Sequence, residues 1–325
     1  MRKFDTEVLQ FALDNCRNQQ FPWLCTIVAS VGSSPRPVGA MLAYIPQGRQ
    51  VGSVSGGCVE EDLLQRITAE EFSTGAPHII EYGVNAEQNE RLGLPCGGRL
   101  TLLLQRLSQT DVSWLEPLLS HINNRHCMER EVDITSGTTQ LRAVDHFTTL
   151  NFDQTTLRQC FGPRLRLLLV GSGQLGESVA ELALAMDYEV LVTDPRQQAL
   201  DQWRGPAVTL LQGMPDDVVR KQAADRYSAI ITLTHDPRID DMALMEALSS
   251  EAWYVGALGS RRTTEKRKKR LQQLDISTDD INSLHAPVGL DIGSKTPIEI
   301  AVAIMAQLTQ LRPRPDVKSA DESNP

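Results

Sequence analysis

The chain has 325 residues, of which 41% are hydrophobic and 22% are charged, a composition typical of an ordinary globular protein. At roughly 150 residues per domain, this length allows about two domains. The net charge of −9 disfavours nucleic-acid binding, which needs a basic surface. No apolar run approaches the ~18 residues of a membrane-spanning helix, and the first residues lack the apolar core of a signal peptide. We therefore expect a cytoplasmic protein that binds neither nucleic acid nor membrane.

The chain contains six cysteines, and none of them forms a CxxC pair with another. In a reducing cytoplasm this spacing argues against a disulfide framework and against a structural zinc site. It also excludes a self-contained iron–sulfur protein of ferredoxin type. Any role of these thiols therefore depends on their individual surroundings.

The first half of the chain predicts mixed α/β structure. Apolar residues at helical spacing favour helices over residues 7–15, 58–72 and 114–122. Short apolar runs favour strands over residues 23–31, 40–45, 51–54, 78–82 and 100–104. The segment from Asp111 to Cys160 is otherwise hard to interpret, and we expect irregular or strand pieces after its helix. We place the end of a first domain, residues 1–160, near Cys160.

From Leu165 onward, strands alternate with amphipathic helices, the pattern of a parallel sheet with crossover helices. We expect strands over residues 167–170, 189–194, 208–211, 229–234 and 253–257, and helices over residues 177–186, 216–224 and 240–248 and after Arg261. Thr296, Pro297 and Glu299 predict a capping box at the start of a last helix. The pattern therefore predicts a Rossmann-like, doubly wound parallel-sheet domain over residues 161–312, followed by a flexible tail over residues 313–325.

Two glycine-rich turns each follow an apolar strand and lead into a helix. The first reads GSVSGGCVE over residues 52–60, and the second reads GSGQLG over residues 171–176. Unpaired backbone N–H groups and the positive end of the helix dipole attract anions at such a turn, and glycine lets a phosphate come close. We therefore expect a phosphorylated ligand. The candidate residues of the first turn are Ser55, Gly56, Gly57, Cys58 and Glu60.

The second turn has the spacing of a dinucleotide fingerprint. Gly171, Gly173 and Gly176 precede an acidic residue, Asp194, at the end of the next strand. Asp194 would accept a hydrogen bond from a ribose hydroxyl. The alternative is that the glycines serve only the turn and the helix packing, with no nucleotide bound.

Further candidates follow the later strands, where ligands lie in such sheets. His235 is either a catalytic residue or a buried or capping histidine. The segment Gly259, Ser260, Arg261 and Arg262 suits a phosphate, because two guanidinium groups stand beside a glycine turn at a helix start. We expect the basic run over residues 265–270 on a solvated helix face.

Cys58 stands at the predicted start of a helix, where a thiolate is stabilised, and Cys96 lies next to Gly97 in the segment LPCGG. Each thiol is either a buried packing residue or part of a soft-metal or sulfur site, so Cys58 and Cys96 are our candidates for metal ligands. Arg36 lies between two prolines shortly after Ser34, and this rigid turn favours an anion clamp.

The chain resembles the XdhC/CoxI family, accessory proteins of molybdenum hydroxylases such as xanthine dehydrogenase, in the segments GSSPRPVGAML, VGSVSGGCVEEDL, LPCGG, GSGQLG, YVGALGSRRT and HAPVGLDIGSKTPIEIAVAI. The resemblance covers nearly the whole chain and is thin only over residues 111–160 and the tail. It implies an XdhC/CoxI-type first domain that handles a cofactor and a Rossmann-like second domain.

The resemblance further implies a chaperone, and not an enzyme with catalytic residues of its own. Such a protein binds molybdenum cofactor, keeps it during sulfuration by a cysteine desulfurase, and delivers it to the large subunit of an apo molybdenum hydroxylase. The cofactor-binding residues would then include Ser34, Arg36, Ser55, Gly56, Gly57, Cys58, Glu60, Cys96 and Gly97. We also expect a homodimer.

Two other functions remain open. An NAD(P)-dependent oxidoreductase would use the second domain with His235, and a nucleotide-sensing regulatory protein would use the turn from Gly171 and Asp194 without either cysteine. The second domain would hold NAD(P), another nucleotide, the nucleotide of a dinucleotide form of the cofactor, or nothing. A molybdenum hydroxylase itself is excluded by the length of the chain and by the missing cluster-binding cysteines.

Overall fold

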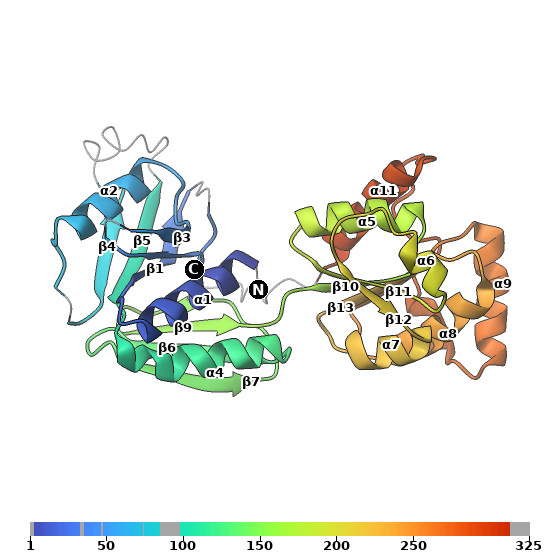
Figure 1. Cartoon of the computed structure of the whole chain (residues 1–325), viewed down its shortest axis with the longest axis horizontal. Helices are drawn as coiled ribbons and strands as arrows, with labels where there is room; N and C mark the ends of the chain where they lie inside the picture. Colours follow the sequence, from blue (N-terminus) through green and yellow to red (C-terminus); the bar gives the residue numbers. More distant parts are fainter. Residues whose placement is uncertain (1–2, 33–35, 47, 74, 85–97, 313–325) are drawn as a thin grey trace, which may run out of the picture. The chain divides into compact units, whose positions relative to one another are not determined.

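The computed structural model describes residues 3–32, 36–46, 48–73, 75–84 and 98–312, and the tail that we expected over residues 313–325 lies outside them. The chain divides into two compact units, with the boundary between Pro163 and Arg164 (Figure 1).

The first unit contains two antiparallel sheets. The five-stranded sheet has the order β3-β2-β1-β5-β4 and consists of β1 (Trp23–Val31), β2 (Met41–Tyr44), β3 (Gln50–Gly52), β4 (His78–Tyr82) and β5 (Arg99–Arg106). The four-stranded sheet has the order β7-β6-β9-β8 and consists of β6 (Cys127–Asp133), β7 (Thr139–Val144), β8 (Asn151–Phe152) and β9 (Thr156–Phe161). The segment from Asp111 to Cys160, for which the sequence predicted a helix followed by irregular or strand pieces, therefore supplies most of a separate four-stranded sheet.

Helices complete the first unit: α1 (Lys3–Arg17), α2 (Cys58–Thr68) and α4 (Val112–Asn123), the last preceded by a 3₁₀ turn over Gln109–Asp111. Val59, Leu63 and Ile67 of α2 are buried against the five-stranded sheet. Apolar residues of α1 and α4 form a separate core with Met128 and Phe161 of the second sheet. Because α2 buries one face against the five-stranded sheet, the position of α2 and of the turn before Cys58 is fixed relative to that sheet.

The second unit contains a five-stranded parallel sheet in the order β12-β11-β10-β13-β14. Its strands are β10 (Arg166–Val170), β11 (Glu189–Asp194), β12 (Thr209–Gln212), β13 (Ser228–Thr232) and β14 (Tyr254–Ala257). The chain moves outward from β10 to β12 and then returns to β13 on the other side of β10. Ligands of doubly wound sheets bind beyond the carboxyl ends of the strands at this point of reversal. The predicted Rossmann-like fold is therefore confirmed.

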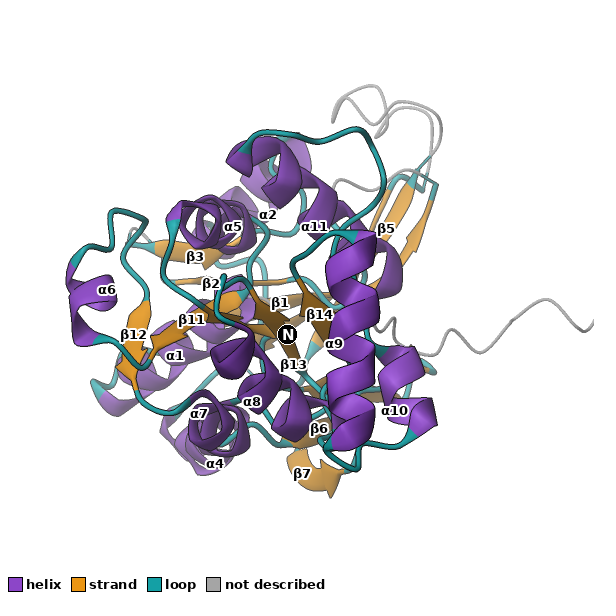
Figure 2. Ribbon diagram, turned by 90° about the vertical axis from the view of Figure 1, so that its right-hand side faces the viewer, coloured by secondary structure: helices purple, strands orange, loops and turns teal. Residues whose placement is uncertain are grey.

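The helices of the second unit are α5 (Gln174–Ala185), α6 (Gln197–Asp201), α7 (Pro215–Gln222), α8 (Pro237–Leu248), α9 (Arg261–Gln273), α10 (Thr278–Ser283) and α11 (Pro297–Leu311). Figure 2 shows α5 and α11 on one face of the sheet and α7 and α8 on the other. The expected capping box of α11 is present, because Glu299 accepts from the backbone N–H of Thr296 (2.9 Å) while the Thr296 side chain accepts from that of Glu299.

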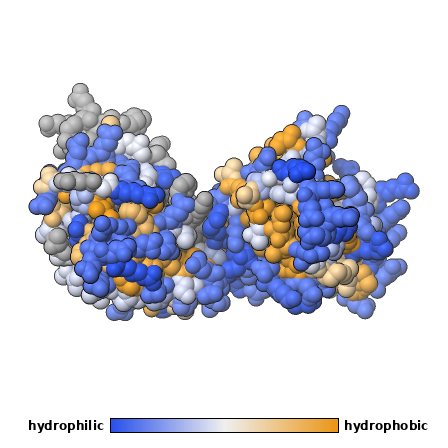
Figure 3. Space-filling view, in the orientation of Figure 1, coloured by the Kyte–Doolittle hydropathy of each residue, from blue (hydrophilic) through white to orange (hydrophobic). Residues whose placement is uncertain are grey.

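On the faces of the two units seen in Figure 3, most surface residues are hydrophilic, and smaller apolar patches lie among them on each unit. Apolar side chains that α11 leaves exposed include Ile298 and Val302. None of the helices in the described part of the chain combines the length and the apolarity that a bilayer crossing requires.

Candidate functional site

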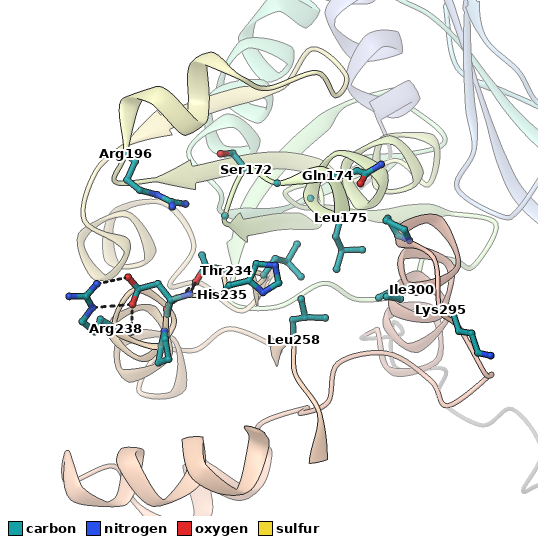
Figure 4. Close-up of a pocket in the computed structure, with 17 residues that line it drawn as sticks. Ser172, Gln174, Leu175, Arg196, Thr234, His235, Arg238, Leu258, Lys295 and Ile300 are labelled. Atoms are coloured by element: carbon teal, nitrogen blue, oxygen red, sulfur yellow. Dashed lines mark hydrogen bonds and ion pairs between the residues drawn. The ribbon is translucent and has the colours of Figure 1, made fainter. Parts of the chain in front are cut away.

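A cavity of about 840 Å³ lies in the second unit beyond the carboxyl ends of β10, β11, β13 and β14 (Figure 4). Its walls are the glycine turn after β10, Arg196 after β11, the segment Leu233–Arg238 after β13, Leu258 after β14, and Lys295, Pro297 and Ile300 at the start of α11. The cavity therefore occupies the place where a doubly wound sheet binds its ligand.

The three glycines of the fingerprint have different environments. At Gly171, where φ is +113°, an added Cβ would lie 2.9 Å from Cγ2 of Thr234, and a Cβ at Gly176 would lie 2.9 Å from the carbonyl oxygen of Gly171. A Cβ at Gly173 would meet no atom within 4 Å. Gly171 and Gly176 are therefore required by the backbone and its packing, whereas Gly173 leaves space on the cavity side of the turn.

The first turn of α5 faces this space. Gly173 is the N-cap residue and supplies no side chain to the N–H groups of the helix. N–H groups of a first helical turn have no acceptor inside the helix. The turn therefore has both the space and the donors that a phosphate needs.

Asp194, the predicted ribose ligand, is fully buried and does not line the cavity. Its Oδ1 accepts from the backbone N–H (3.0 Å) and Nε (2.9 Å) of Arg196, and its Oδ2 accepts from Nη2 of Arg196 (2.9 Å) and from the Ser172 hydroxyl (3.4 Å). Burial alone would raise the pKa of Asp194, but the hydrogen bonds from Arg196 and Ser172 together hold this pKa below its ordinary value. The Asp194 carboxylate is therefore paired with Arg196, and Arg196, not Asp194, lines the cavity.

His235 is exposed and lines the cavity, between residues that are firmly held. Asp236 caps α8 by accepting from the backbone N–H of Arg238 (3.0 Å), and it also pairs with the guanidinium of Arg238 (2.8 Å). The Thr234 hydroxyl donates to Oδ1 of Asp240 (2.7 Å). His235 is thus a cavity residue and not a buried or capping histidine.

A buried ion pair supports both rims of the cavity from behind. Nη2 of Arg267 donates to Oδ2 of Asp240 (2.9 Å), and Nη1 of Arg267 donates to the carbonyl oxygen of Leu258 (3.0 Å). Asp240 in turn holds Thr234. The side chain of Arg267 is only 2% exposed. The prediction that residues 265–270 form a solvated face is therefore wrong at Arg267, because this arginine turns inward to pair with the buried Asp240.

The predicted phosphate segment after β14 does not line the cavity beyond Leu258. Ser260 caps α9 by accepting from the backbone N–H of Thr263 (3.1 Å). Arg261 is exposed and lies 3.7 Å from Asp291, and Arg262 is also exposed. The roles of Gly259, Ser260, Arg261 and Arg262 in ligand binding stay predictions.

In the first unit, the strand directions bring the sequence motifs to one edge of the five-stranded sheet. The pairing of Val31 with Arg99, and of Leu42 with Gly52, places the ends of β1 and β3 and the start of β5 at the same edge. A Cβ at Gly32 would lie 3.4 Å from Cα of Gly98, so these two glycines lie side by side just beyond the end of β1 and the start of β5. The turn before Cys58 begins at this edge as well.

The first glycine turn holds an anion that belongs to the chain itself. Oε2 of Glu60 accepts from the Ser53 hydroxyl (2.7 Å) and from the backbone N–H groups of Val54 (3.0 Å), Ser55 (3.3 Å) and Gly56 (3.3 Å). Burial acts to raise the pKa of Glu60, but these hydrogen bonds together hold it below its ordinary value. Glu60 therefore shapes the turn from within, where the sequence suggested a ligand phosphate.

Cys58 is the first residue of α2, as expected, and its side chain is exposed. Among the described residues, a Cβ at the preceding Gly57 would meet no atom within 4 Å, so the turn has free space directly before Cys58. Arg36 lies half-buried in the connection between β1 and β2. Ser34, Cys96 and Gly97 lie outside the described residues. Within those residues, no group of three or more His, Cys, Asp or Glu side chains is placed to hold a metal ion.

Several residues of the cavity were missed from the sequence: Arg196, Arg238 and Lys295. A signal for Arg196 was present, because it follows Asp194 by two residues just beyond the carboxyl end of β11. No comparable signal marked Lys295, which reaches the cavity only because the chain before α11 returns to the glycine turn.

Two family models match the chain. The XdhC and CoxI family model matches residues 16–83, and the XdhC Rossmann domain model matches residues 167–308. A Bacillus subtilis protein described as a probable xanthine dehydrogenase subunit is 28% identical over 321 residues, covering 91% of this chain and 95% of that protein. The molybdenum cofactor insertion chaperone PaoD of Escherichia coli is 27% identical over 307 residues, covering 94% of this chain and 88% of that protein.

The fold is also similar to a solved structure. A Bacillus halodurans protein described as a xanthine dehydrogenase superposes with a TM-score of 0.73 at 26% identity, covering 94% of this chain and 95% of that one. Sequence and structure therefore agree over both units. The chain belongs to the XdhC and CoxI family.

Proposed function

We propose that this protein is a chaperone that binds molybdenum cofactor and inserts it into an apo molybdenum hydroxylase of the xanthine dehydrogenase type. The name of the Escherichia coli relative describes this role, and that of the Bacillus subtilis relative describes part of a xanthine dehydrogenase. Both similarities extend over nearly the full length of this chain.

The observation that carries the proposal is the shared edge of the first unit. Cys58 is exposed at the start of α2, and the turn that leads to it leaves β3 at the edge that also holds the end of β1 and the start of β5. Molybdopterin supplies a phosphate, which suits a helix N-terminus and an arginine, and a soft metal–dithiolene centre, which tolerates a thiol neighbour. We assign the phosphate contact to Arg36 and the thiol neighbour of the metal to Cys58, while Ser55, Gly56 and Gly57 form the turn whose N–H groups Glu60 and the Ser55 hydroxyl occupy.

Ser34, Cys96 and Gly97 are added to the proposed site on the family resemblance of their sequence segments. Cys58 and Cys96 are then the two candidate thiols for sulfuration of the cofactor by a cysteine desulfurase. The acceptor would be the large subunit of the hydroxylase, and the chaperone would act as a homodimer in the cytoplasm.

For the second unit we propose a separate nucleotide ligand such as NAD(P). The open side of Gly173, the uncapped start of α5 and the cavity support this proposal. The same cavity exposes His235, which keeps an NAD(P)-dependent oxidoreductase as the second candidate function.

The decisive experiment measures activation of an apo molybdenum hydroxylase by the full chain purified from molybdenum-replete cells. Each loaded chaperone delivers its cofactor once. Hydroxylase activity should therefore rise in proportion to the amount of loaded protein added and level off at a fixed molar ratio of chaperone to hydroxylase. Turnover of a nicotinamide substrate at catalytic protein levels, with no molybdenum transferred, would overturn the chaperone in favour of the oxidoreductase.

A further inference from the structure

The cavity of the second unit has cationic side chains at both ends, and apolar side chains line it near one of them. In Figure 4, Arg196 and Arg238 lie on one side of the cavity and Lys295 on the other, with Leu258 and Ile300 towards Lys295. The acidic residue among the lining residues is Asp236, and Arg238 pairs with it. Arg196 pairs with the buried Asp194, but 61% of its side chain is exposed, so at the end of the cavity beyond β11 the group that presents N–H donors to an anion is Arg196.

In dinucleotide-binding sheets, the residue at the end of the second strand selects between two riboses. An aspartate with a free oxygen accepts hydrogen bonds from a ribose diol, whereas a nearby arginine accommodates a 2′-phosphate. Here β11 is that second strand, and Asp194 is its last residue.

Asp194 is not available as an acceptor for a diol. Both of its oxygens accept from Arg196, and the residue is fully buried. The guanidinium of Arg196 is held in a fixed orientation by this pair, while its side chain is 61% exposed. The remaining N–H donors of the guanidinium are therefore presented to the cavity in a geometry that fits a phosphate.

We propose that the cavity binds a dinucleotide whose adenosine ribose carries a 2′-phosphate, that Arg196 contacts this phosphate, and that Asp194 positions Arg196. This inference rests on the nucleotide site proposed above for the second unit. It is independent of where the molybdenum cofactor binds.

The test is calorimetric titration of the full chain with NADP⁺ and, separately, with NAD⁺. A charge-assisted contact to the 2′-phosphate should make NADP⁺ bind about tenfold tighter or more. Adenosine 2′,5′-bisphosphate against AMP should show the same preference, because the selecting group is on the adenosine ribose.

Three variants locate the preference. Arg196→Ala should lower the affinity for NADP⁺ by about tenfold and leave that for NAD⁺ unchanged or higher, since Asp194 then has free oxygens. Arg196→Lys keeps the charge and should retain part of the preference. Arg226→Ala is the matched control, because Arg226 is a similarly exposed arginine of the same unit, 3.7 Å from Glu251 and outside the cavity lining.

If Arg196→Ala does not fold, as judged by its thermal melting, the comparison of Arg196→Lys with wild type decides. Equal binding of the two dinucleotides, or tighter binding of NAD⁺, would overturn the inference. Binding of neither at millimolar concentration would also overturn it, together with the nucleotide site. Molybdenum and pterin content, measured on the same preparations, report separately on the chaperone.

Discussion

The two glycine turns look alike in sequence but differ in what occupies their N–H groups. In the first unit, Glu60 accepts from three consecutive backbone N–H groups, so the turn carries its own anion. In the second unit, Gly173 opens onto a cavity, and Asp194, which stands behind the turn, is paired with Arg196. A strand–glycine turn–helix pattern therefore predicts an anion, but the rest of the chain determines whether that anion is internal or a ligand.

The acidic residues Glu60 and Asp240 also have different structural roles in the two units. Glu60 keeps the first turn in shape and leaves Cys58 exposed beside it. Asp240 and Arg267 connect the segments after β13 and β14 from behind the second cavity. Removing each acid separately measures how much stability it contributes.

The largest effect is expected for Asp240→Ala. This change removes the carboxylate to which Nη2 of the buried Arg267 donates and leaves Oδ1 of Asp241 3.9 Å from its Nε, so the free energy of unfolding should fall by about 3–5 kcal/mol. Urea unfolding at pH 7 measures it. Asp217→Ala is the control, because Asp217 forms an exposed pair with Arg220 and its loss should cost less than about 1 kcal/mol. Equal losses in the two variants would contradict the support role of Asp240.

A smaller effect is expected for Glu60→Ala, which leaves the buried N–H of Val54 and its neighbours without an acceptor. The free energy of unfolding should fall by about 2 kcal/mol, and Glu60→Gln, which keeps an acceptor oxygen, should lose less. Both variants are measured by the same urea unfolding. If Glu60→Ala is as stable as wild type, the turn does not depend on its internal anion.

Glu60 also predicts a dependence on pH. Because its pKa in the folded protein lies below the ordinary value of 4.5, its contribution to stability is fully present above that value and is lost as the pH falls through the lower folded value. Wild type should therefore lose more stability on acidification below pH 4.5 than Glu60→Gln does. Parallel losses in the two proteins would assign the acid sensitivity to other carboxylates.

The smallest effect on stability is expected for Gly173→Val. The new side chain meets open space, so the free energy of unfolding should change by less than about 1 kcal/mol, while nucleotide binding at the cavity should be abolished. Gly176→Val is the matched control and should be clearly destabilised, because its Cβ would meet the backbone oxygen of Gly171. Unchanged nucleotide binding in Gly173→Val would mean that the turn only packs.

Most of the fold was predictable because its elements repeat simple patterns. The strands β1, β4 and β11 have the predicted bounds, and α11 begins at the predicted capping box. The four-stranded sheet of the first unit was not predicted as a sheet. Its strand β6 is buried along most of its length, and its neighbour β7 varies only between half-buried and exposed positions, so the apolar–polar alternation of a strand with one buried face is weak in both.

The candidate site was predictable in place but not in detail. The fingerprint correctly located the turn and the open position at Gly173. The direction of the Asp194 carboxylate was not predictable, since it depends on Arg196 folding back onto it. Likewise, Glu60 stands one helical turn after the first glycines, and only the three-dimensional turn shows that it reaches their N–H groups.

We propose that molybdenum cofactor binds at the edge with Cys58 and that a nucleotide binds in the cavity with Gly173. The most direct test is the molybdenum and pterin content of wild type, Cys58→Ser and Gly173→Val, purified in parallel from molybdenum-replete cells. Cys58→Ser should lose most of its cofactor without losing stability, because the thiol is exposed, and Gly173→Val should retain the wild-type amount. Full cofactor in Cys58→Ser together with its loss in Gly173→Val would contradict the account.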